Sequence, residues 1–254
     1  MLGIPGDSLN EVLSANELLT RCNLMRAKEF PNFDTPMPIG RNVVVVGAGN
    51  TAMDALRVCM RLGAKSVSCV YRRSRTECPA RAEEVHHAEQ EGVVFHWLTH
   101  PVEVLDNGDG GVRAIRCVRM ELGEPDESGR RRPVPVQGSE HDLETDLVVF
   151  AIGTNANPII GQTSRLKLNK RGYIDADASL ATSLPGVFAG GDIVTGAATV
   201  IEAMGAGRKA ARSMKEYLGL RDIHAPYASD AAGPVQKYFG ITARERNFVR
   251  MRLA

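Results

Sequence analysis

The residues best suited to chemistry lie in a glycine-rich segment. Four consecutive valines, 43–46, lead directly into Gly47-Ala48-Gly49-Asn50-Thr51-Ala52. An unbroken β-branched run is typical of a strand with both faces buried in a parallel sheet. The G-x-G-x-x-A spacing supplies a tight turn, bare backbone that a pyrophosphate can approach, and a small residue for close helix–strand packing. We therefore expect a dinucleotide-binding turn over 47–52, with the amino end of the next helix facing the phosphates.

An arginine cluster follows at the spacing that this kind of site requires. A second parallel strand is predicted over 66–71, and it runs into Arg72 and Arg73, with Arg75 close behind. A site for NADH would place an acid here for the ribose diol, whereas guanidinium groups suit the 2′-phosphate of NADPH. The sequence therefore favours NADPH. The alternative is a solvated loop, which is the usual environment of a run of charges.

Composition limits the other classes of partner. The chain has 254 residues, with 31 Lys and Arg against 30 Asp and Glu. This balance produces no strong field that would attract nucleic acid or an anionic membrane. No apolar stretch approaches the length of a membrane span, and the first residues lack the pattern of a signal peptide. We expect a cytoplasmic protein that binds neither nucleic acid nor membranes.

The cysteines and histidines predict no metal site and no catalytic side chain. The five cysteines are scattered, and none forms C-x-x-C, so neither zinc, iron–sulfur nor dithiol chemistry is indicated. Cys59 and Cys69 fit the apolar patterns of a helix and a strand. His86 and His87 are expected to face solvent or to pack, and His96 to be structural. No Ser–His–Asp set and no pair of acid–base carboxylates stands out.

The first half of the chain is predicted to hold one α/β domain. Residues 1–38 are expected to form a connector on the side of a second domain, with a helix over 15–28 capped by Ser14. Residues 39–155 are expected to form a Rossmann-like, NADPH-binding domain with a parallel sheet. Alternating segments at 102–105, 112–120 and 133–137 predict an antiparallel β-meander inserted into that sheet. A last buried strand over 147–152 ends at Gly153, at the edge where ligands of open α/β sheets bind.

The second half is predicted to belong to another nucleotide-binding fold over 156–220, followed by a tail over 221–254. A strand over 187–189 delivers Gly190, Gly191 and Asp192. A helix is predicted over 199–218, and we expect it to turn six apolar residues towards a core: Ile201, Met204, Ala210, Ala211, Met214 and Leu218. Gly190–Asp192 could also be a purely structural turn with the acid as a local cap.

Taken together, these motifs resemble those of the two-dinucleotide-fold flavoprotein reductases. Within that group the chain is most similar to the small (β) subunit of NADPH-dependent glutamate synthase and to the large subunit of NADH-dependent ferredoxin–NADP oxidoreductase. The resemblance covers nearly the whole chain and is carried by seven segments: 2–6, 14–19, 47–54, 71–75, 89–93, 151–153 and 186–192.

The resemblance implies the cofactors and their ligands. In that family an NADPH-binding domain is inserted into an FAD-binding domain, of which this chain would hold the C-terminal part. The turn residues Gly47, Gly49, Asn50, Thr51 and Ala52 would hold the NADPH pyrophosphate, and Arg72 and Arg73 its 2′-phosphate. Gly191 and Asp192 would face FAD, with Asp192 towards the ribityl–phosphate chain. Thr199 and Val200 open a helix whose positive end would favour charge on the reduced flavin.

The family also has an FAD-binding glycine unit and a cysteine-rich iron–sulfur segment ahead of this region. The chain is therefore expected to be the middle-to-C-terminal piece of a larger reductase, inactive by itself, with that missing segment as a partner. The implied function is NADPH-dependent flavin reduction. Its electrons would pass to iron–sulfur centres, a ferredoxin-type protein or the glutamate synthase large subunit. The alternative is an isolated NADP(H)-binding or regulatory module with no FAD and no turnover of its own.

Overall fold

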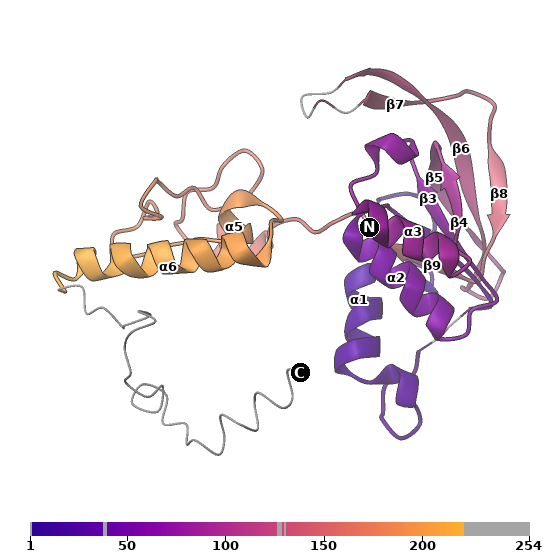
Figure 1. Cartoon of the computed structure of the whole chain (residues 1–254), viewed down its shortest axis with the longest axis horizontal. Helices are drawn as coiled ribbons and strands as arrows, with labels where there is room; N and C mark the ends of the chain where they lie inside the picture. Colours follow the sequence, from indigo (N-terminus) through magenta and orange to yellow (C-terminus); the bar gives the residue numbers. More distant parts are fainter. Residues whose placement is uncertain (1, 38–39, 126–128, 130, 221–254) are drawn as a thin grey trace. The chain divides into compact units, whose positions relative to one another are not determined.

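The computed structural model describes residues 2–37, 40–125, 129 and 131–220 (Figure 1). The chain divides into two compact units, and the division falls between Gly153 and Thr154. The predicted tail over 221–254 lies outside the described residues.

The first unit is built on a five-stranded parallel sheet in the order β1-β9-β2-β3-β4. Its strands are β1 (Val12–Ser14), β2 (Asn42–Val46), β3 (Ser66–Tyr71), β4 (Val94–Trp97) and β9 (Leu147–Phe150). The valine run forms the central strand, β2, and every one of its valines is buried. Successive valines point into the two cores on opposite faces of the sheet, which explains why the run has no polar alternation.

Helices cover one face of this sheet (Figure 1). They are α1 (Ala15–Leu19), α2 (Asn50–Arg61) and α3 (Ala82–Gln90). Leu18, Met53, Leu56 and Val85 pack into one core with the inward side chains of β2, β3 and β9. The buried face of α2 therefore fixes the position of its amino-terminal end relative to the sheet.

Antiparallel strands cover the other face. They are β5 (Thr99–Asp106), β6 (Val112–Pro125), β7 (Arg131–Pro135) and β8 (His141–Glu144). β5, β6 and β7 are neighbours in that order, and β8 pairs with β6. Ile115 and Cys117 of β6 pack against Val44 and Phe150 of the parallel sheet. The predicted α/β class, with a β-meander inserted before the last parallel strand, is confirmed.

The segment before residue 38 differs from its prediction as a connector with one helix. Val12–Ser14 forms the edge strand β1 beside β9. A strand of three residues is too short to be predicted from hydrophobic periodicity. The Oγ atom of Ser14 does cap α1, accepting a hydrogen bond from the amide of Glu17 at 3.1 Å. The α-helix ends at Leu19 and continues as a π-helical turn over Thr20–Leu24. It stops well short of residue 28.

The second unit contains α4 (Ile159–Thr163), α5 (Asp192–Thr195) and α6 (Val200–Tyr217). The short strands predicted here, including 187–189, are present only as isolated bridges, such as Ala181 with Phe188. The side chain and backbone of Thr199 form a capping box with Glu202, so α6 begins where predicted.

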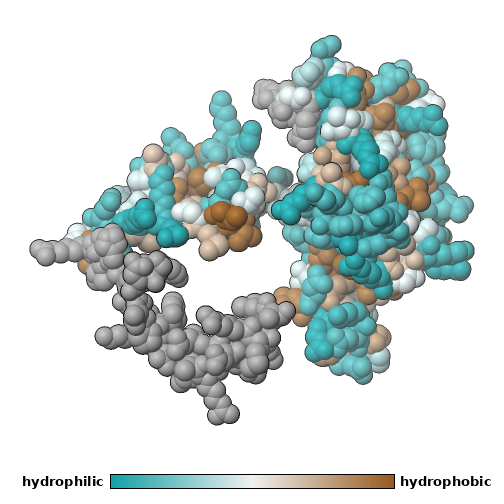
Figure 2. All heavy atoms as spheres, viewed as in Figure 1, coloured by the Kyte–Doolittle hydropathy of each residue, from teal (hydrophilic) through white to brown (hydrophobic). Residues whose placement is uncertain are grey.

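The predicted burial of α6 is wrong for most of its apolar side chains. Of the six, only Ala210 is buried, while Ile201 is 81% exposed and Met204 64% exposed. Figure 2 shows hydrophobic side chains at the surface over the amino-terminal end of this helix. The predicted helix is therefore present, but no element in the described part of the second unit covers its apolar face.

Candidate dinucleotide site

The turn between β2 and α2 has a shape that only glycine permits at its first position. Gly47 has a φ of 124°, and a Cβ atom there would lie 2.4 Å from the carbonyl oxygen of Ala151. Its amide donates a hydrogen bond to the carbonyl of Val70 at 2.9 Å. The chain therefore turns sharply between the ends of β3 and β9 before it enters the helix.

The following residues leave hydrogen-bond donors open at the start of α2. The amides of Ala52 and Met53 donate to the carbonyl of Gly49, at 2.9 and 3.1 Å. Those of Gly49, Asn50 and Thr51 have no acceptor among the described residues. A Cβ atom on Gly49 would meet nothing within 4 Å, so the space beside the turn is free. An anion can approach these amides closely, and the helix dipole favours it there.

Gly153 lies at the same edge of the sheet. The register pairs Val46 with both Val70 and Phe150, which aligns the carboxyl ends of β2, β3 and β9. Gly153 is exposed three residues after β9, with a φ of 89° and open space around its Cα. The first-unit residues singled out by the sequence are therefore gathered at one edge, where open α/β sheets bind ligands.

The three arginines of the loop after β3 have different environments. Arg72 is exposed, and its guanidinium has no hydrogen-bond or ion-pair partner among the described residues. Arg73 is only 6% exposed, and its Nε atom donates to the carbonyl of Arg131 at 2.9 Å. Arg75 forms a two-pronged ion pair with Glu89 of α3, whose hydrogen bonds raise the pKa of Arg75. Of the three arginines, Arg72 alone presents an uncommitted guanidinium.

The loop is held by a buried carboxylate. Glu77 accepts hydrogen bonds from the hydroxyl of Ser74 and from the Nε atom of Arg131, the latter at 2.8 Å. The backbone carbonyl of Glu77 accepts the hydroxyl of Tyr71 at 3.0 Å. The hydrogen bond from Ser74 and the interactions with Arg131 lower the pKa of Glu77. Because Arg131 begins β7, the meander contacts the loop over residues 72–81 through this residue.

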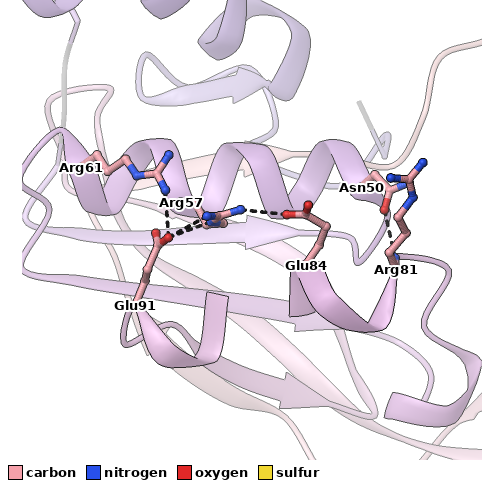
Figure 3. Close-up of polar contacts among 6 residues, drawn as sticks. All are labelled: Asn50, Arg57, Arg61, Arg81, Glu84 and Glu91. Atoms are coloured by element: carbon pink, nitrogen blue, oxygen red, sulfur yellow. Dashed lines mark hydrogen bonds and ion pairs between the residues drawn. The ribbon is translucent and has the colours of Figure 1, made fainter. Parts of the chain in front are cut away.

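The far end of the loop returns to the glycine turn. The amide of Ala80 and the thiol of Cys78 both donate to the carbonyl of Ala48, at 3.1 and 3.3 Å. The amide of Arg81 donates to Oδ1 of Asn50 at 3.0 Å. Figure 3 shows the Arg81 side chain beside Asn50 at the amino-terminal end of α2. Arg81 was not among the predicted site residues, because its closeness to the turn depends on this long-range return of the chain.

A cluster of ion pairs fixes α2 against α3 (Figure 3). Arg57 of α2 contacts Glu84 at 2.8 Å and Glu91 at 2.9 Å, and Arg61 reaches Glu91 at 2.9 Å. Burial would raise the pKa of Glu91, but the bonds from Arg57 and Arg61 outweigh it and lower that pKa. These contacts hold the start of α3, and hence Arg81, at a fixed place beside α2.

Two half-buried histidines, His96 and His100, have lowered pKa values, and no histidine in the described part of the chain forms a hydrogen-bonded pair with a carboxylate. Burial first, and then the nearby charge of Arg72, lower the pKa of His100. Burial and His141 lower the pKa of His96. His86 and His87 are exposed on α3. Among the described residues, no group of three or more His, Cys, Asp or Glu side chains could hold a metal ion.

The predicted residues of the second unit are grouped around a cleft of about 570 Å³. Gly191, with a φ of 78°, and Asp192 form one side of the cleft at the start of α5. Thr199 and Val200 form another at the start of α6. The cleft thus has two helix starts and an acid at its border, and its remaining lining is largely small and apolar.

The cysteines offer no redox pair. All five are free, and four of them are buried. Burial raises the pKa of the Cys59 thiol to about 12, and that of Cys117 also to about 12. In the described part of the chain, no helix combines the length and apolar character needed to cross a membrane.

Comparison with solved structures supports the fold. The structure of FprA from Mycobacterium tuberculosis in complex with NADPH superimposes with a TM-score of 0.69. That alignment covers 86% of this chain and 61% of FprA, at 21% sequence identity. A thioredoxin reductase from T. acidophilum gives a TM-score of 0.62 at 23% identity. The Rossmann-like α/β architecture is therefore shared with pyridine-nucleotide reductases.

Comparison with characterised sequences gives the family. The β subunit of the NADP(+)-dependent formate dehydrogenase of Moorella thermoacetica is 53% identical over 180 residues, which are 70% of this chain and 25% of that protein. The small chain of the NADPH glutamate synthase of Escherichia coli is 42% identical over 184 residues, 70% of this chain and 39% of that one. The chain thus spans well under half the length of these relatives. The pattern of the pyridine nucleotide-disulphide oxidoreductases matches residues 1–207, and the resemblance to the glutamate synthase small subunit is confirmed. The chain belongs to the pyridine nucleotide-disulphide oxidoreductase family.

Proposed function

We propose that this chain is the NADPH-binding part of a flavin oxidoreductase of the glutamate synthase small-subunit type. The observation that carries the proposal is the open turn at the start of α2, with the uncommitted guanidinium of Arg72 at the same sheet edge. NADPH would supply a hydride to FAD, and the chemistry would belong to the cofactors. The protein's task in this proposal is to bind, orient and shield them from water.

The proposed NADPH ligands follow from the geometry of the turn. The amides of Gly49, Asn50 and Thr51 would bind the pyrophosphate, with Gly47 making the turn and Ala52 allowing close packing. These donors fit an anion because they are aligned and unpaired in the described structure.

The arginines divide into two roles in this proposal. Arg72 would contact the 2′-phosphate. Arg73 and Arg75 are committed to Arg131 and Glu89, and we assign them to holding the loop in place. Gly153 would lie at the same edge of the sheet, and because it has no side chain it would not obstruct the nucleotide.

FAD is proposed to bind the cleft of the second unit. Gly191 would let the backbone approach the cofactor, and Asp192 would face its ribityl–phosphate chain. Thr199 and Val200, at the start of α6, would bring a positive helix end towards the flavin ring. Further polypeptide, of the kind that makes up the rest of the longer relatives, would complete this site.

The relatives' subunit names support the proposal that this chain works with a further subunit. The E. coli relative is a small chain, and the M. thermoacetica relative is a β subunit. We propose that electrons pass from FAD to iron–sulfur centres, and from there to a large subunit or a ferredoxin-type protein. A cytoplasmic location remains our proposal on the basis of composition.

A second candidate function is an NADP(H)-binding or regulatory module without turnover. It is favoured by one observation: the proposed NADPH ligands all come from the first unit, whereas the second unit leaves α6 largely uncovered within the described residues. Such a chain would bind NADPH without holding FAD.

Titration calorimetry with NADPH and NADH tests the nucleotide proposal. We expect tighter binding of NADPH, and we expect Arg72→Ala to weaken it by about tenfold or more with little change for NADH, since one charge-assisted contact is lost. Arg61→Ala removes the same charge from the other end of α2 and should not change the preference. A chain that binds neither nucleotide at millimolar concentration contradicts the proposal.

The absorption spectrum separates the two candidate functions. A yellow chain whose flavin absorbance is bleached by NADPH supports the reductase. A colourless chain that still binds NADPH, and that gains no absorbance when FAD is added, supports the module.

A further inference from the structure

We propose that the thiols of Cys69 and Cys78 are positioning groups for the nucleotide's pyrophosphate. They hold two carbonyls of the glycine turn so that the amide of Gly49 faces the ligand. The role rests on the proposed function, since it concerns the same nucleotide site.

Each thiol donates to one of two consecutive carbonyls in the turn between β2 and α2. The Sγ atom of Cys69, in β3, lies 3.2 Å from the carbonyl oxygen of Gly47. The Sγ atom of Cys78 lies 3.3 Å from the carbonyl oxygen of Ala48, which also accepts from the amide of Ala80 at 3.1 Å. A buried strand and the loop over residues 72–81 thus hold successive peptide groups of the turn.

The geometry of a trans peptide converts a held carbonyl into a direction for the next amide. The carbonyl oxygen and the amide hydrogen of one trans peptide group point in opposite directions. Within the described residues the only cis peptide bond is Phe30-Pro31. Because the Ala48 carbonyl is directed at its two donors, the Gly49 amide points away from them. That amide has no acceptor in the described part of the chain, and the space beside Gly49 is free.

Both thiols keep the hydrogen that they donate. Burial raises the pKa of the Cys69 thiol, and the neighbouring Cys78 adds to that shift. Burial also raises the pKa of Cys78 and outweighs the opposing effects of the Ala80 amide and of Arg75. A thiolate could not donate to a carbonyl oxygen, so a raised pKa is the condition that this role requires.

The pair at the turn is not a general consequence of burying a thiol. The remaining three cysteines are buried, and their thiols form no hydrogen bond with any described residue: Cys22, Cys59 and Cys117. Donation to a backbone carbonyl is therefore confined to the two thiols beside the glycine turn.

The weight of these contacts falls on the ligand more than on the fold. A thiol is a weak donor, so losing one contact should cost little stability. A hydrogen bond from an amide to a phosphate is charge-assisted, and it weakens steeply when the donor is misaligned. NADPH and NADH carry the same pyrophosphate. Loss of a thiol should therefore weaken both nucleotides alike and leave the ratio of their affinities unchanged.

Titration calorimetry of the full chain with NADPH and NADH tests this role. We expect Cys78→Ala to weaken both nucleotides by about threefold or more, with a nearly unchanged thermal midpoint. Cys78→Ser keeps a donor at the same place and should recover most of the affinity. The same two substitutions at Cys69 should give the same order. Cys59→Ala removes a thiol without a hydrogen bond from the same core and is the matched control.

The amide signal of Gly49 reports the peptide group in the absence of any ligand. In a chain labelled for NMR spectroscopy, a change in the hydrogen bonds to the Ala48 carbonyl alters the chemical shift of the Gly49 nitrogen, because both atoms belong to one peptide group. We expect the signal to move in Cys78→Ala, to move less in Cys78→Ser and to stay in place in Cys59→Ala. An unmoved signal in Cys78→Ala overturns the proposal.

The remaining outcomes are also decisive. Unchanged affinities in the alanine variants overturn the proposal, and so do serine variants that bind as weakly as the alanine variants. A lowered thermal midpoint with no recovery by serine assigns the thiols a purely structural role. If the unsubstituted chain binds neither nucleotide, the proposed function fails. The Gly49 signal still decides whether the thiols direct the amide, so the two failures are distinguishable.

Discussion

Gly47 and Gly49 belong to one motif, but the structure needs them for different reasons. A side chain on Gly47 would collide with the backbone at Ala151, and its φ of 124° is strained for any other residue. Gly49 has an ordinary extended backbone, with a φ of −83°, and free space beside its Cα. The first glycine therefore serves the fold of the turn. The second keeps open the space that an approaching phosphate would occupy.

This difference predicts opposite behaviour of two alanine variants. Gly47→Ala should lower the free energy of unfolding by at least about 2 kcal/mol, because it combines a strained φ with a backbone collision. Gly49→Ala should change the unfolding free energy by no more than about 1 kcal/mol, the usual range for a cap position. It should nevertheless weaken NADPH binding by more than about tenfold, since the methyl group fills the phosphate's approach. Urea denaturation and calorimetry measure both; a stable Gly49→Ala that binds NADPH normally would contradict this role.

At this scale the sequence predicted which residues gather at the sheet edge, whereas the roles assigned to their side chains stay predictions. Arg72, Arg73 and Arg75 look equivalent in the sequence, and a shared phosphate was the simplest interpretation for the pair 72–73. Their difference comes from partners far along the chain: Arg131 is 58 residues from Arg73, and Glu89 is 14 residues from Arg75. The closeness of Arg81 to Asn50 was not predicted, for the same reason. Local spacing cannot reveal such contacts, because tertiary folding creates them.

Among the elements, the meander does more than cover the sheet. Through Arg131 it binds both the carboxylate of Glu77 and the Nε group of Arg73, so β7 fastens the loop that carries Arg72. Glu77 is 9% exposed and is held by Ser74 as well. The loop's conformation therefore depends on a charged Glu77. Strand β7 would therefore affect the proposed nucleotide site, although no residue of β7 is proposed as a ligand.

Glu77→Gln tests this fastening through its pH dependence. The pKa of Glu77 is lowered in the folded chain below its ordinary value of about 4.3, so the unfolded chain binds more protons in that range. The stabilisation it gives is present above the ordinary pKa and is lost as the pH falls through the folded one. Thermal midpoints of the unsubstituted chain and the variant should differ most near pH 7 and approach each other below about pH 4. A difference that stays constant with pH would contradict the charged role of Glu77.

The elements that the sequence predicted well are those with long, regular burial patterns. β3 occupies the predicted residues, and β2 and α2 lie where the valine run and the glycine motif indicate. The sequence did not predict β8, a four-residue strand with alternating half-buried and exposed positions. The exposed face of α6 was wrongly predicted to be buried because periodicity shows which face is apolar, not whether something covers it.

For the whole molecule, the exposed apolar face of α6 and the residues proposed to hold the nucleotide belong to different units. Val200, Ile201 and Met204 at the start of α6 are 76%, 81% and 64% exposed. Adjacent exposed apolar side chains of this kind usually mark a surface that another protein segment covers. The proposed nucleotide ligands, by contrast, all lie in the first unit. Changes to the α6 face should therefore leave NADPH binding unaffected.

Replacing Ile201 and Met204 together with glutamate tests that independence. We expect the double variant to lose at least about half of the chain's fluorescence with an uncharged apolar dye such as Nile red, because the dye binds exposed hydrophobic surface. Its NADPH affinity should match that of the unsubstituted chain. Arg208→Glu with Arg212→Glu places two acids at exposed polar positions of the same helix, and this control should keep the dye signal. Weakened NADPH binding in the apolar-face variant alone would show that the α6 surface supports the nucleotide site, and the separation of roles between the two units would then be wrong.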